Sequence, residues 1–171
     1  MTQKRFPMRI LAASDGSAPS MEAVELAAEM AAATGSELHL LHVTMISRYI
    51  YPDILSETQV KRIREESQAK LDAEVARATA AGIKIAESYL RLGRIDVEIL
   101  TLAEEIKAGM IVIGNRTGDA IHRILLGNDA ESIVRHAHCP CSWPALKSLE
   151  NRRLQPRVDS AALPGGRALA I

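Results

Sequence analysis

The chain has 171 residues, which is enough for one globular domain with some additional length. Lys and Arg together number 21, as do Asp and Glu, and this zero net charge argues against a protein-wide nucleic-acid surface. Aromatic residues make up only 3%, so the chain lacks platforms on which single-stranded bases could stack. No apolar run is long enough to span a membrane, and the start does not resemble a signal peptide. We therefore expect a cytoplasmic protein without nucleic-acid or membrane partners.

The first fifty residues predict a strand, a helix and a second strand. The apolar run Arg9–Ser14 ends at the polar turn Asp15–Ser17, which is typical of a strand leading into a helix. The segment Met21–Ala33 is rich in good helix formers, and Gly35 is the expected C-terminal cap. The segment Glu37–Thr44 is again apolar and strand-like. This order favours a βαβ unit with two parallel strands.

The middle of the chain predicts a long amphipathic helix and a third strand. The segment Met45–Leu55 has no clear period, and we expect an irregular connection there. Ser56 begins a helix, with Gln59 three residues later as its capping-box partner, and Ala81-Gly82 ends it. Spacings of three and four place one set of residues on the face expected to meet the core: Val60, Ile63, Ser67, Leu71, Val75 and Ala78. The segment Ile83–Leu90 then alternates loosely, as a strand would.

The last third continues the alternation of helices and strands. Its expected elements are helix Asp96–Lys107, ended by Gly109, strand Met110–Ile113, helix Asp129–His136 and strand Pro140–Ala145. The core candidates of the first of these helices are Val97, Leu100, Leu102 and Ala103. Such alternation predicts an α/β fold: a five-stranded parallel doubly wound sheet with helices on both faces. Ligands of these sheets bind at the carboxyl ends of the strands, where the strand order reverses.

The end of the chain differs in composition from the rest. From Leu146 onwards it contains prolines and glycines without a periodic apolar pattern, and its five basic and two acidic residues give +3. We expect residues 1–145 to form the α/β domain and residues 146–171 to form a flexible, basic tail. A solvated tail is the simpler interpretation, and a binding arm is the alternative.

A glycine-containing loop follows the fourth strand. Gly114 ends that strand, and Gly127 and Asn128 immediately precede the next helix. Such a loop can cradle phosphate, because glycines let backbone N–H groups approach and the helix adds positive potential. Arg116, His122 and Arg123 supply positive or protonatable groups nearby. The alternative is that the glycines only permit a tight turn and Asn128 only caps the helix.

Two other features of the sequence bear on chemistry. The cluster of His136, His138, Cys139 and Cys141 could hold zinc or copper, but four ligands within six residues suit a closed site poorly. We expect no metal site there. P-loop, Rossmann, HExxH, GxSxG and kinase motifs are absent, and no catalytic set of nucleophile and base is visible. The sequence therefore predicts no enzyme.

Three separated segments resemble the universal stress protein family. The segment Met110–Pro140 is similar to its C-terminal signature, Arg9–Ser20 to its first strand and turn, and Leu40–Thr44 to its second strand. The resemblance covers about residues 8–141. It implies the adenine nucleotide α-hydrolase-like fold, a homodimer, and the binding of ATP or another adenine nucleotide, with or without Mg²⁺. Pro144 would shorten the last strand through which such dimers form. Trp143 could instead anchor a partner, and ordinary packing of Trp143 in the core is the alternative.

The resemblance also implies a set of site residues. Asp15 matches the family aspartate near the adenosine, Val43 matches a residue against the adenine, and Gly114 and Gly127 match glycines of the phosphate loop. Two positions depart from the family pattern, because Thr117 stands where a glycine is expected and Asn128 stands where Ser or Thr is expected. The implied set is Asp15, Val43, Ile113, Gly114, Arg116, Thr117, Gly118, Gly127 and Asn128.

Three hypotheses of function follow from these observations. The first is a stress-response binding module that holds an adenine nucleotide without strong catalytic activity. The second is a dimeric scaffold of the same fold that binds no nucleotide and acts through protein contacts of its last strand and tail. The third, a nucleotide hydrolase, has the least support, because no catalytic set is visible.

Overall fold

A parallel β-sheet of five strands forms the centre of the molecule, which is a computed structural model that describes residues 8–46, 56–114 and 128–142. The strands are β1 (Arg9–Ser14), β2 (Glu37–Met45), β3 (Glu87–Gly93), β4 (Met110–Ile113) and β5 (Cys141–Ser142). Their spatial order is β3-β2-β1-β4-β5, and every neighbouring pair is parallel. The predicted five-stranded parallel sheet is confirmed.

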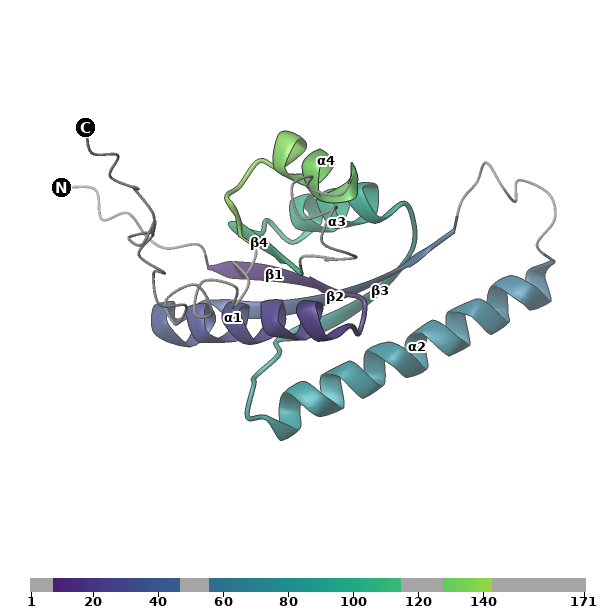
Figure 1. Ribbon diagram of the computed structural model, residues 1–171, viewed down its shortest axis with the longest axis horizontal. Helices are drawn as coiled ribbons and strands as arrows, with labels where there is room; N and C mark the ends of the chain where they lie inside the picture. Colours follow the sequence, from purple (N-terminus) through teal and green to yellow (C-terminus); the bar gives the residue numbers. More distant parts are fainter. Residues whose placement is uncertain (1–7, 47–55, 115–127, 143–171) are drawn as a thin grey trace, which may run out of the picture.

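In the part of the chain that the structure describes, four helices cover the two faces of this sheet. They are α1 (Ala18–Thr34), α2 (Glu57–Ala80), α3 (Ile95–Glu105) and α4 (Asn128–His136). Figure 1 shows α1 and α2 on one side of the strands and α3 and α4 on the other. This is the doubly wound arrangement expected when strands and helices alternate along a chain.

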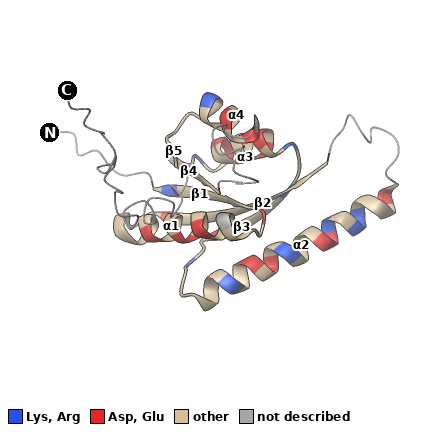
Figure 2. Ribbon diagram, in the orientation of Figure 1, with Lys and Arg blue, Asp and Glu red and all other residues tan. Residues whose placement is uncertain are grey.

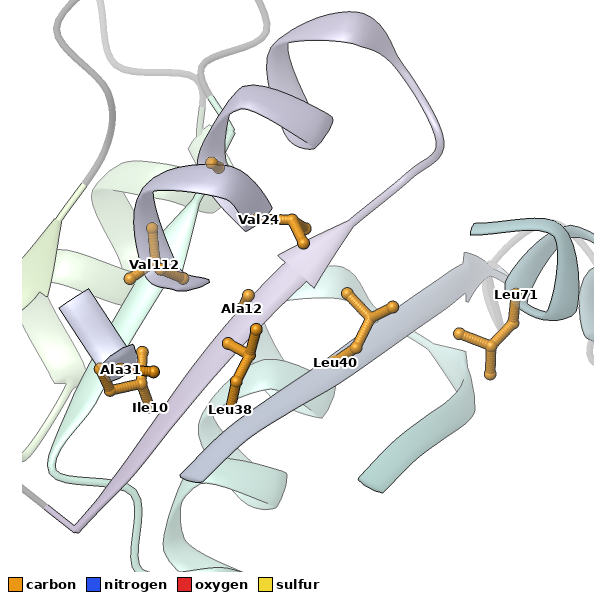
Figure 3. Packing of buried hydrophobic residues seen from close by; sticks show 10 residues of the cluster. Ile10, Ala12, Val24, Ala31, Leu38, Leu40, Leu71 and Val112 are labelled. Carbon is orange, nitrogen blue, oxygen red and sulfur yellow. The ribbon is translucent and has the colours of Figure 1, made fainter. Parts of the chain in front are cut away.

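A separate hydrophobic cluster fills the space on each side of the sheet. On one side Ala12, Leu38 and Leu40 pack against Val24 of α1 and Leu71 of α2 (Figure 3). On the other side the members come from β1, β2, β4, α3 and α4: Leu11, Leu41, Ile99, Leu102, Ala103, Ile111, Ile113 and Ile133. Since successive side chains of a strand point to opposite faces of the sheet, neighbouring residues of β1 belong alternately to the two clusters.

The helix ends follow local signals in the sequence. The Ser17 hydroxyl accepts a hydrogen bond from the Ser20 N–H at the start of α1, and Gly35 ends the helix with φ 71°. Ser56 and Gln59 form the predicted capping box, in which each side chain bonds the other residue's backbone N–H. These caps satisfy helix-end groups that would otherwise lack hydrogen-bond partners.

The long helix α2 is charged on its outer side and rests on few core residues. Basic and acidic side chains follow one another along it (Figure 2), while Leu71 and Ala78 are buried against the sheet. The predicted face is confirmed at Ser67, Leu71 and Ala78, whereas Val60 and Ile63 are only partly buried. Glu74 is also buried, although its charge predicts a solvent-facing position.

Three local predictions are wrong. Strand β3 begins four residues later than expected, because Ile83 and Ile85 pack against the core from the connection that precedes it. Helix α3 ends at Glu105, and Lys107 rather than Gly109 takes the left-handed conformation beyond it, with φ 53°. Val97 was predicted to lie in the core but is 44% exposed, and Ile99, two residues later, is buried in the core.

Strands β1 and β4 lie side by side although about a hundred residues separate them. Ile10 pairs with Met110 and Ala13 with Ile113. The strand order reverses at this pair, because β2 and β3 follow β1 on one side of the sheet and β5 follows β4 on the other. In open α/β sheets such a reversal opens a crevice at the carboxyl ends of the strands. Of the helices in the described ranges, none has the length and apolar character needed to cross a membrane.

Candidate functional site

A pocket of about 310 Å³ opens at the carboxyl ends of β1 and β4, where the strand order reverses. This volume lies at the lower end of the range of roughly 300–1,000 Å³ that is usual for small-molecule pockets. Its apolar lining is formed by Ala13, Val43, Met45, Ile95, Ile99, Ile113, Ala130 and Ile133. Its polar lining is formed by Ser14, Asp15, Ser17, Ser20, Gly114 and Asp129.

The apolar wall of the pocket gathers residues from five elements: β1, β2, β4, α3 and α4. Val43 extends from β2, Ile113 from the end of β4, and Ile99 from α3. Ile99 and Ile113 are buried in the core cluster on this side of the sheet, so the wall continues into a well-packed interior. A surface of this kind suits a planar apolar group such as a purine ring.

The turn between β1 and α1 forms a polar edge of the pocket. Ser17 N–H donates to Asp15 Oδ1 at 3.1 Å, and Gly16 N–H donates to Ser14 Oγ at 3.1 Å. Gly16 has φ 79°, a left-handed conformation that a residue with a Cβ adopts only at a cost. The sequence Asp-Gly-Ser therefore builds a closed turn that presents the Asp15 side chain at the mouth of the pocket.

A cluster of three serine hydroxyls lies behind this turn. The Ser20 hydroxyl donates to the Ser17 carbonyl at 2.8 Å, so the Ser14 hydroxyl must be the donor in the 3.0 Å bond that joins Ser14 and Ser20. Ser14 and Ser20 are buried, whereas Ser17 is partly exposed. Since these hydroxyls satisfy one another, the cluster chiefly stiffens the turn.

A buried contact between a histidine and a glutamate supports the same turn from the opposite face of the sheet. His42 Nδ1 of β2 lies 3.0 Å from Glu74 Oε1 of α2, and the exposed fractions of these side chains are 6% and 2%. Glu74 Oε1 also lies 2.9 Å from the point where a Cβ on Gly16 would be placed. Glu74 Oε2 is buried and has no hydrogen-bond partner among the described residues. The turn is thus built directly against a buried carboxylate.

A second buried carboxylate joins α3 to α4 beside the pocket. The Ser132 hydroxyl donates to Asp96 Oδ2 at 2.8 Å, and Arg94 donates to both oxygens of Asp96 at 3.2 and 2.8 Å. Burial alone would raise the pKa of Asp96, but the hydrogen bonds from Ser132, Arg94 and a backbone N–H outweigh it and hold that pKa below its usual value. This contact fixes α4, whose first turn brings Asp129 and Ala130 to the pocket.

The structure brings four of the implied site residues together. Asp15, Val43, Ile113 and Gly114 come from three separate strands or strand ends, and all of them line the one pocket. Arg116, Thr117, Gly118 and Gly127 lie outside the described residues. Asn128 is the first residue of α4, but its side chain is not among those described.

Sequence reasoning missed part of the lining. Ile99 lies in the predicted helix Asp96–Lys107 and Ile95 directly precedes it, and neither these two residues nor Asp129 were among the predicted site residues. One signal could have indicated Asp129, because it lies in the first turn of the helix that follows the candidate phosphate loop. The first turn of such a helix lies near any group that the loop binds. Ile99 is buried in the core and also lines the pocket, and the sequence pattern does not distinguish these two roles.

The cluster of histidines and cysteines that begins at the last residue of α4 is held by ordinary contacts. His138 pairs with Glu104 at 2.6 Å, and His136 Nδ1 lies 2.8 Å from the Ser132 carbonyl oxygen. Burial raises the pKa of both the Cys139 and the Cys141 thiol, which keeps them protonated. Within the described ranges, no three His, Cys, Asp or Glu side chains converge as metal ligands would.

Comparisons with known proteins identify the family of the chain. The sequence model of the universal stress protein family matches residues 8–142. Universal stress protein MJ0531 of Methanocaldococcus jannaschii is 33% identical over 138 residues, which cover 77% of this chain and 78% of that protein.

Two solved structures have the same fold. A protein of the universal stress protein family from Burkholderia pseudomallei is 30% identical with a TM-score of 0.55, covering 78% of this chain and 92% of that one. A universal stress protein in complex with cAMP is 24% identical with a TM-score of 0.62, covering 80% of this chain and 95% of that one. With a family match that spans most of its length, the chain belongs to the universal stress protein family.

Proposed function

We propose that this protein is a stress-response binding module that holds an adenine nucleotide, ATP or a shorter relative, in the pocket between β1 and β4, without strong catalytic activity. The observation that carries the proposal is the meeting of Asp15, Val43, Ile113 and Gly114 on one pocket of ligand size. These residues come from three segments that lie far apart in the sequence, and all of them belong to the predicted adenine-nucleotide site. The fold accommodates such a ligand in at least one relative, the universal stress protein in complex with cAMP.

The described residues fit the parts of a nucleoside. The apolar wall of Val43, Ile99 and Ile113 can cover the faces of an adenine ring. The Asp15 carboxylate at the mouth can accept hydrogen bonds from ribose hydroxyls. Gly114 begins the loop that would carry backbone N–H groups towards a phosphate, and α4 follows that loop. Mg²⁺, where present, would neutralise phosphate charge.

Calorimetric titration and thermal unfolding with AMP, Mg-ATP and GMP test the proposal. A ligand at a hundredfold excess over its Kd raises the stability of the folded state by about 2.7 kcal/mol, which is a clear shift in Tm. We expect such a shift with an adenine ligand and a smaller one with GMP. If no adenine ligand binds or shifts the Tm at millimolar concentration, the proposed function is wrong.

A pair of matched variants locates the binding. Val43→Trp fills the apolar wall of the pocket and should abolish the ligand-induced shift. Val97→Trp makes the same change on α3 at a residue that is 44% exposed and does not line the pocket, so the shift should remain. Equal binding by both variants would place the ligand elsewhere on the protein.

We also propose that the protein is a cytoplasmic homodimer, as the family resemblance implies. Strand β5 is an edge of the sheet, where a second copy could extend the strand order. Sedimentation equilibrium at micromolar concentration tests this assembly. A monomer at that concentration would contradict it.

A further inference from the structure

The described lining of the pocket is acidic. It includes the carboxylates of Asp15 and Asp129 and contains no Lys, Arg or His side chain. The two carboxylates come from different elements, the β1–α1 turn and the first turn of α4. Among the described residues, these two carboxylates place negative charge on two sides of the pocket, where it would repel the phosphates of a nucleotide.

The charges in the first turn of α4 affect how strongly an anionic ligand group is attracted to this end of the helix. A helix amino end normally attracts anions, because its N–H groups and its dipole both present positive charge. Here the first turn carries two acids, Asp129 and Glu131, which oppose that attraction. Glu131 makes an ion pair with Arg135 at 2.6 Å and does not line the pocket.

Asp129 differs from Asp15 and from Glu131 in its contacts. The Asp15 carboxylate already accepts the Ser17 N–H within its own turn. Asp129 lines the pocket from an exposed position, and its carboxylate has no ion pair with any residue in the described ranges. Its charge is therefore the one most directly felt by a ligand group that lies at the start of α4.

We propose that Asp129 is a specificity-determining residue, which makes the pocket favour adenine ligands with no phosphate or one phosphate over free di- and triphosphates. The inference rests on the proposed function, because it concerns the phosphate end of the same ligand. Like charges a few ångströms apart near a protein surface repel each other, and the effect grows with the charge of the ligand. Since Asp129 is exposed, salt screens part of that repulsion.

The test compares Asp129→Asn with Glu131→Gln in the full-length chain. Both changes remove one negative charge from the first turn of α4, but only Asp129 lines the pocket. Calorimetric titration with adenosine, AMP and ATP is carried out in EDTA at low salt. We expect Asp129→Asn to leave adenosine affinity within about twofold, to raise AMP affinity about threefold and to raise ATP affinity about tenfold. Glu131→Gln should change ATP affinity by less than about threefold.

Salt gives a second readout that a merely structural effect would not reproduce. The gain in ATP affinity from Asp129→Asn should shrink severalfold when the ionic strength is raised from roughly 0.01 to 0.5 M, since the Debye length shortens. An equal change in adenosine and ATP affinity would overturn the inference, as would equal effects of the two variants on ATP. In those cases adenosine still binds and the proposed function stands. If adenosine, AMP and ATP all fail to bind the unaltered protein, the proposed function is wrong and this inference falls with it.

Discussion

Replacing His42 by leucine should strongly destabilise the protein, although leucine is apolar and the position is buried. The change removes the hydrogen-bonding partner of the Glu74 carboxylate, in a side chain that is only 2% exposed. Glu74 Oε2 already has no hydrogen-bond partner among the described residues, so the variant would leave both oxygens of this buried group without one. Breaking a buried pair from one side costs about 3–5 kcal/mol. We therefore expect a loss of that size in the free energy of unfolding.

The double variant His42→Leu with Glu74→Met separates the buried charge from other effects. Methionine keeps the length of the glutamate side chain without its charge. Apolar replacement of a whole buried pair is often neutral, or stabilising by about 1–4 kcal/mol. The double variant should therefore recover most of the stability that His42→Leu loses. Urea unfolding, followed by circular dichroism, measures all three variants of the cycle.

His39 on the same strand provides a matched control. It is also 5% exposed, and its Nδ1 lies 3.2 Å from the Tyr89 hydroxyl oxygen. That hydroxyl donates to Glu87 at 2.6 Å, so His39→Leu leaves no buried charge unpaired. Its cost should be about 0.5–1.5 kcal/mol. If His42→Leu costs no more than His39→Leu, or if the double variant recovers nothing, the reasoning from buried charge is wrong.

Three further predictions concern pH, backbone conformation and packing. The pKa of Asp96 is lowered in the folded state, so its stabilising contribution is complete above the usual aspartate pKa of about 4 and is lost as pH falls below that value. Asp96→Asn should therefore flatten this acidic part of the curve of unfolding free energy against pH. Gly16→Ala should cost more free energy of unfolding than Gly35→Ala in urea. Both glycines have positive φ, where a Cβ costs about 1–2 kcal/mol, but only the Cβ added at Gly16 would also lie 2.9 Å from a Glu74 oxygen. Leu71→Ala should cost about 2–5 kcal/mol by the same assay, because Leu71 is 1% exposed beneath α2, and a loss below 1 kcal/mol would mean that α2 is not anchored there.

The strands next to the site could be predicted closely from the sequence. The runs that form β1 and β4 are short, apolar and bounded by turn residues, so their limits match the structure at both ends. Strand β3 could not be placed in the same way, because Ile83 and Ile85 are apolar yet belong to the connection before it. Hydrophobic alternation reports burial, and a connection that packs against the core produces a similar pattern.

The site could be predicted only in part, for a related reason. Asp15 and Gly114 follow strands whose carboxyl ends share one edge of the sheet, so strand order alone brings them together. Glu74 and Asp129 are charged residues on helices, and a sequence pattern assigns such residues to solvent. Their positions follow from tertiary contacts: Glu74 faces His42 across the interior, and Asp129 is carried to the pocket by the placement of α4.

Two buried carboxylates contact elements that line the pocket, and these contacts bear on how the pocket would bind a ligand. Glu74 meets His42 behind the β1–α1 turn, and Asp96 joins α3 to α4 through Ser132. Apolar pairs in the same places could give equal or greater stability, so stability alone does not account for these contacts. Hydrogen bonds and ion pairs are directional, and each of these fixes an element that lines the pocket. We infer that the described walls are held in place before a ligand arrives, which lowers the entropic cost of binding.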